Sequence, residues 1–178
     1  MDPEARRRAC VVFRAKLSRD TGLNLPAAVC EGLLDTTYEK CGGGEEVSLQ
    51  SNPGQFYTCL GRVIADLELP SLVLPDNLKV ALWCYREAAE VYTHPRGMHS
   101  LAWCYDNGQG VTKDPAQAAV WFQRAADLGD AHSKATLGSL FLYGDARAGV
   151  VKDAARGLTL FREAVDLGHD PALYHSAT

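Results

Sequence analysis

The sequence predicts an all-α fold made of stacked antiparallel pairs of helices. A stretch that begins at Leu101 is repeated from Leu137, and each copy has apolar residues at helical spacing on either side of a glycine-rich break. The composition agrees with this class, because 47% of the 178 residues are apolar and 22% are charged, which is typical of a globular chain that buries a core. No apolar run approaches the ~18 residues that a membrane-spanning helix needs.

The first 50 residues do not match the repeated pattern but predict two helices of their own. Apolar residues alternate with basic ones from Pro3 to about Ser18, which indicates an amphipathic helix. A second helix is expected from Leu25-Pro26 to Lys40, with Leu33 on its apolar side. The end unit of a stack of repeats exposes apolar surface. We therefore expect residues 1–50 to form an N-terminal helical cap.

The repeat region is expected to cover residues 51–178. A degenerate copy starts at Leu60 and resumes after a longer loop at Asp76. Two clear copies follow it, and the short tail carries Leu173 and Tyr174, which are suited to covering the other end of the stack. The predicted boundaries are 51–94 for the degenerate unit, 95–129 and 130–168 for the clear units, and 169–178 for a C-terminal cap.

Local signals in the central unit define two helices and the turn between them. Leu101 and Tyr105 are one turn apart and project from one face. Gly108 ends the first helix, because glycine adopts left-handed backbone conformations at little cost. Asp114 can cap the second helix, and Pro115 fits its first position. Small residues, Ala102 and Gly138, are expected where a neighbouring helix approaches closely.

The combined turn, cap and aromatic pattern resembles the Sel1-like repeat, a relative of the tetratricopeptide repeat. The match is close from Leu101 to Gly129, good with an insertion from Leu137 to Gly168, and weak from Leu60 to Ala89. The resemblance implies a right-handed α-solenoid (an α-α superhelix) whose members scaffold protein complexes. It also implies that the first helix of each unit lines a concave surface.

A stripe of polar and aromatic residues runs along these first helices, apart from the packed leucines. Aromatic and arginine side chains along one groove are typical of a surface that binds a peptide segment. Gln55, Thr58, Ala65, Ala135 and Leu142 fall on or beside the same stripe. The candidate protein-binding residues are Arg62, Arg96, His99, Trp103, Asp106, His132, Ser139 and Tyr143. The alternative is that Trp103 packs against the N-terminal helices and that the polar residues are only solvated.

Other kinds of site lack support in the sequence. The five histidines include no pair at the spacing of a metalloprotease helix, and Gly42-Gly43-Gly44 is not followed by the residues of a phosphate-binding loop. A Cys–His nucleophile would need a base within reach in a water-excluding pocket, which solenoids rarely provide. We expect no catalytic residue, no metal, no cofactor and no enzymatic activity.

The charge and the cysteines bear on partners and location. A formal net charge of −4 argues against a nucleic-acid partner. The basic residues from Arg6 to Arg19 form either a solvated face or a contact for an acidic partner, a phosphate or a membrane surface. Without an apolar signal sequence, we expect six free thiols in an intracellular protein, in the cytoplasm rather than an organelle, with a disulfide framework as the alternative.

These observations favour a protein–protein interaction adaptor that binds a partner segment in the concave groove. A structural subunit of a larger assembly, with its edges buried against neighbours, is the alternative, and an enzyme comes third.

Overall fold

The computed structural model describes residues 3–40, 51–66 and 76–169. These residues form α-helices and one short π-helical segment, and the only β-pairing among them is an isolated bridge between Asp145 and Val150. The predicted all-α class is confirmed. The elements are α1 (Pro3–Thr21), α2 (Ala27–Lys40), α3 (Pro53–Asp66), α4 (Asn77–Arg86), the π-helical segment η1 (Glu87–Val91), α5 (Pro95–Asn107), α6 (Pro115–Asp127), α7 (Ala131–Tyr143) and α8 (Ala154–Asp166).

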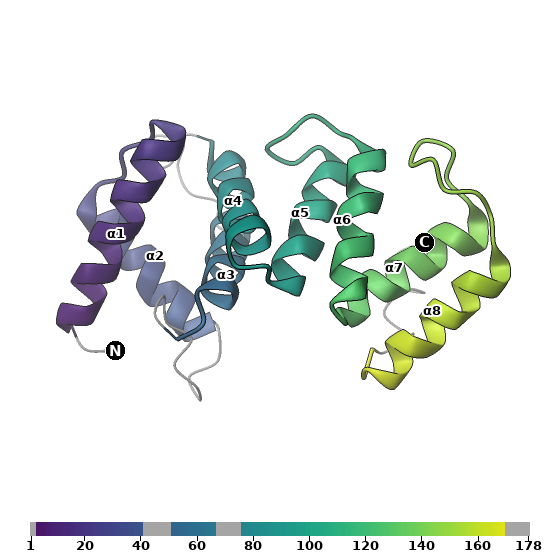
Figure 1. Cartoon of the computed structure of the whole chain (residues 1–178). Coiled ribbons are helices and arrows are strands. Elements are labelled where there is room, and N and C mark those ends of the chain that lie inside the picture. Colours follow the sequence, from purple (N-terminus) through teal and green to yellow (C-terminus); the bar gives the residue numbers. More distant parts are fainter. Residues whose placement is uncertain (1–2, 41–50, 67–75, 170–178) are drawn as a thin grey trace.

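The helices stack in chain order, with α1 at one end of the molecule and α8 at the other (Figure 1). Helix α3 packs on α4, α5 on α6, and α7 on α8, and each pair contacts the next through α4 with α5 and through α6 with α7. This arrangement is the predicted solenoid of stacked helix pairs. Apart from His169, the predicted C-terminal cap (169–178) lies outside the described residues, as does the end of the predicted N-terminal cap, residues 41–50.

The helix ends follow the predicted capping chemistry. The Asp114 carboxylate accepts the backbone N–H of Gln117 at 3.0 Å, and Pro115 occupies the first turn of α6. Gly108 ends α5 with a φ of 73°, in the left-handed region that favours glycine. Asp130 caps α7 in the same way as Asp114 caps α6, by accepting the N–H of Ser133 at 2.7 Å.

One apolar core runs through the stack. The repeat leucines Leu60, Leu101 and Leu137 are buried, and Tyr105 packs half-buried against the same core. The prediction that Leu101 and Tyr105 project from one face is therefore confirmed, and that face is the one packed on the core.

Small residues mark the closest helix contacts. A Cβ added to Gly138 would lie 3.0 Å from Phe161 Cδ2, and one added to Gly157 would lie 2.8 Å from the carbonyl oxygen of Gly138. Ala102 is completely buried, as expected. Helices α7 and α8 thus cross with their backbones nearly in contact, and only glycine fits at the crossing.

The N-terminal helices share this core and are tied to the degenerate unit by polar contacts as well. The Phe13 ring lies 5.8 Å from that of Trp83, and the Trp83 indole N–H donates to Asp20 at 3.3 Å. The Lys16 ammonium of α1 forms an ion pair with the largely buried Glu87 of η1. Part of the basic N-terminal face is therefore engaged inside the protein.

The cysteines differ from the expectation of six free thiols. Four have free, buried thiols: Cys10, Cys30, Cys84 and Cys104. Cys59 is disulfide-bonded, so the prediction is wrong for this residue. Burial raises the pKa of the Cys84 thiol and raises that of Cys104 to about 12, which leaves both thiols protonated and unreactive.

Candidate functional site

The predicted stripe lies on the first helices of the three units, on α3, α5 and α7. Its two large aromatic side chains are exposed, Trp103 by 44% and Tyr143 by 76%. Ala135 is fully buried, so its assignment to the stripe is wrong. Of the candidates, Arg62 is exposed on α3, Arg96, His99, Trp103 and Asp106 follow one another along α5, and His132, Ser139 and Tyr143 follow one another along α7.

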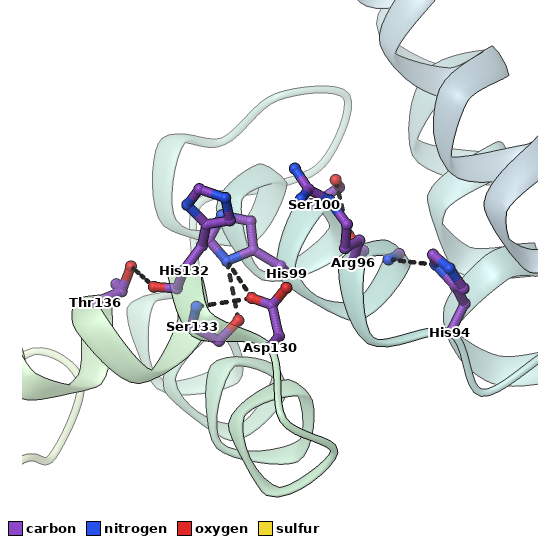
Figure 2. A network of polar contacts seen from close by, with 9 residues as sticks. His94, Arg96, His99, Ser100, Asp130, His132, Ser133 and Thr136 are labelled. Carbon is purple, nitrogen blue, oxygen red and sulfur yellow. Dashed lines mark hydrogen bonds and ion pairs between the residues drawn. The ribbon is translucent and has the colours of Figure 1, made fainter. Parts of the chain in front are cut away.

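The structure brings together only part of this stripe. Arg96, His99 and His132 meet where α5 and α7 begin (Figure 2). Asp106 is at the other end of α5, near the turn after α7. The pKa of Arg147 in that turn is raised mainly by Asp145, and the charge of Asp106 raises it as well. Trp103 and Tyr143 occupy the later turns of α5 and α7. The candidate residues therefore form a polar cluster where α5 and α7 begin, and Trp103 and Tyr143 lie further along the same helices.

A depression of about 490 Å³ opens at this edge. It is built from the turns that lead from one unit into the next, so equivalent positions of successive units meet there. The starts of α5 and α7 contribute Arg96 and His132, and the ends of α6 and α8 contribute Leu128 and Leu167. The complete lining is His94, Pro95, Arg96, Leu128, Gly129, Asp130, Ala131, His132, Leu167, Gly168 and His169.

His99 stands behind the depression in a polar contact with the start of α7. Its Nδ1 lies 2.9 Å from the Ser133 hydroxyl and 3.5 Å from the Asp130 carboxylate (Figure 2). Its ring packs against Phe122 at 5.3 Å between centroids. Burial lowers the pKa of His99 to about 4, against an opposing effect of Asp130, so the ring is neutral at pH 7.

Three histidine rings continue in a row from this contact. His132 lies 5.8 Å from His99 and 4.8 Å from His169, measured between ring centroids. Burial, and then the charge of Arg96, lower the pKa of His132. The lowered pKa values favour the neutral form of His99 and His132 at physiological pH.

His94 caps α5 and connects it to α3. Its Nδ1 accepts the backbone N–H of Gly97 at 3.3 Å and lies 3.2 Å from the Thr58 hydroxyl. An accepting Nδ1 carries no proton, and burial lowers the pKa of the ring. The residue has a structural role that Asp130 repeats at the start of α7.

Sequence reasoning missed the apolar part of this site. Leu128, Leu167 and His169 are not among the residues that the sequence predicts for the site. The available signal was the Leu-Gly pair that ends both clear units, since it places an exposed leucine at the end of each unit's second helix.

Within residues 3–40, 51–66 and 76–169, no group of three or more His, Cys, Asp or Glu side chains could hold a metal ion. A membrane-spanning helix is also not found in this part of the chain.

The stacked helix pairs place the chain among the α-solenoid repeat proteins. A sequence model of the Sel1 repeat matches residues 68–90, 95–130 and 133–169, which is more than half of the chain. The chain belongs to the Sel1 repeat family, and the resemblance seen in the sequence is confirmed. Proteins of this family are generally scaffolds for protein–protein interactions rather than enzymes.

A solved structure supports the same fold. The chain is similar to a Sel1 repeat protein from Oxalobacter formigenes, with a TM-score of 0.54 and 25% identity, over 75% of this chain and 89% of that protein. Among curated proteins, none matches.

Proposed function

We propose that this protein is an adaptor that binds a segment of a partner protein across helices α5 and α7. One observation carries the proposal: the exposed residues of two successive units converge on a single depression, with Arg96 and His132 beside Leu128 and Leu167. Polar groups next to exposed apolar side chains in a preformed hollow are typical of peptide-binding sites.

The stacked backbone supplies the pre-organisation that such binding needs. Asp130 and His94 hold the starts of α7 and α5 by capping bonds, and His99 connects the two helices through Ser133. A partner segment would then be anchored by Trp103 and Tyr143 without ordering a flexible loop. We therefore propose that the binding surface runs from the depression along α5 and α7 to Trp103 and Tyr143.

The test is affinity purification from the native cell with the wild-type chain and with Trp103→Ala. Removal of a central aromatic anchor should weaken capture by about 2 kcal/mol, or roughly thirtyfold. The matched control is Val120→Ala, which truncates a similarly exposed side chain on α6. Equal recovery of partners by wild type and Trp103→Ala would remove this surface from the function.

A structural subunit of a larger assembly is the second candidate, and the last helix of the described residues, α8, favours it. Leu158 and Val165 of α8 are 55% and 47% exposed, and Val151 before them is exposed as well. Exposed apolar side chains on an end helix indicate a contact with another surface. Recovery of one stable multi-subunit complex, lost on Leu158→Ser but kept on Trp103→Ala, would select this function.

The proposal places the adaptor inside the cell, in the cytoplasm rather than an organelle, with no nucleic acid among its partners. Cell fractionation with an antibody to the chain tests the location.

A further inference from the structure

Arg96 is the one cation in the lining of the depression, and its charge is not used elsewhere in the described part of the chain. Arg96 is exposed at the start of α5, and its guanidinium makes no ion pair or hydrogen bond with any described residue. The positive charge of Arg96 acts on its neighbours in the site. Burial is the largest cause that lowers the pKa of His94 and of His132, and the charge of Arg96 is the second. An acceptor brought into the depression therefore finds an available guanidinium.

The one acidic side chain in the lining does not neutralise this charge. The Asp130 side chain is only 5% exposed, and its Oδ1 accepts the N–H of Ser133 and faces His99 at 3.5 Å. Its charge is directed into the junction between α5 and α7. The side of the depression that faces solvent consequently offers the Arg96 guanidinium and the imidazoles of His94 and His132, whose pKa values are lowered.

The walls of the depression are aliphatic at two equivalent positions. Leu128 and Leu167 end the second helices of successive units, and both are about half exposed. A partner segment that contacts both leucines has to cross the depression. The backbone of that segment therefore continues on both sides of the residue that faces Arg96. That geometry suits a side chain inside a segment better than the end of a chain.

We propose that the depression binds the side-chain carboxylate of an aspartate or glutamate in the partner segment, through Arg96, while aliphatic neighbours of that residue pack on Leu128 and Leu167. A guanidinium and a carboxylate match as a forked, two-bond pair. One cation in a chain of net charge −4 does not suit a nucleic-acid backbone, which needs several. The inference rests on the proposed function, since it names the chemistry of the segment bound there.

The experiment uses the full chain to select ligands from a random-peptide phage library, followed by titration of a selected peptide and its Glu→Gln or Asp→Asn counterpart. We expect selected peptides to carry an acidic residue next to aliphatic ones. Arg96→Gln should weaken the acidic peptide about ten- to a hundredfold, and should not weaken the amide counterpart further. Arg96→Lys should restore part of the affinity, because it keeps the charge but not the fork.

The matched control is Arg162→Gln, which removes an exposed arginine of α8 outside the depression and should leave affinity unchanged. Melting temperatures of all variants show that the fold is intact. Peptides that depend on Trp103 but bind Arg96→Gln as well as wild type would overturn the carboxylate site and leave the adaptor function standing. A wild-type chain that selects no peptide at all would count against the adaptor function itself.

Discussion

The crossing of α7 and α8 provides the sharpest test of the repeat packing. Replacement of Gly157 by alanine places a methyl group 2.8 Å from the carbonyl oxygen of Gly138 and 3.0 Å from the backbone nitrogen of Leu142. Both are backbone atoms that cannot rotate away, so the two helices have to move apart.

The expected effect is the difference between two terms. Overpacking at a contact of this kind costs about 2–3 kcal/mol, and alanine in place of glycine in a helix returns about 1 kcal/mol. Gly157→Ala should therefore lower the free energy of unfolding by about 1–2 kcal/mol, and the melting temperature by roughly 2–8 °C.

The chain contains a matched control for this substitution. Gly32 is exposed within α2, and a Cβ added there meets no atom within 4 Å. Gly32→Ala should raise the free energy of unfolding by about 0.5–1 kcal/mol, since only the helix propensity changes. Urea unfolding of wild type and both variants measures the two effects, and a stabilising Gly157→Ala would refute the close crossing of α7 and α8.

Three further predictions concern charged groups and thiols. Lys16→Met should lower the free energy of unfolding by about 2–3 kcal/mol, because it leaves the largely buried carboxylate of Glu87 without its cation. The double variant Lys16→Met with Glu87→Leu should recover much of this loss, as measured by urea unfolding. Equal stability of Lys16→Met and wild type would contradict the prediction. The pKa of His99 is about 4 in the folded state, below its ordinary value of 6.5. Between these two pH values the unfolded chain binds a proton at His99 and the folded chain does not. The free energy of unfolding should therefore fall by up to about 3 kcal/mol as the pH drops from 6.5 to 4. His99→Asn should flatten that pH dependence, and an unchanged slope would show that His99 does not contribute. The buried free thiols should resist a thiol reagent in the native protein and react once urea unfolds it. These are the thiols of Cys10, Cys30, Cys84 and Cys104. A fast reaction in the native protein would contradict their burial.

Local chemistry explains why so much of the fold could be predicted. Asp114 followed by Pro115 starts α6 and Gly108 ends α5, because both effects act within a few residues. Helical periodicity places Leu101 and Leu137 on buried faces without knowledge of their neighbours. Repetition of the whole pattern then implies stacking, since a single unit cannot bury its own apolar face.

The sequence alone therefore determined the class, the helix ends and the buried leucines of this protein. It also predicted that Arg96, His99 and His132 lie along one stripe. Only the tertiary structure decided that these three residues meet at the turns between units, with Leu128, Leu167 and His169 beside them, while Ala135 is buried. The reason is physical: contacts within a helix depend on the spacing of residues, whereas a hollow between units depends on the angle and distance at which whole helix pairs pack.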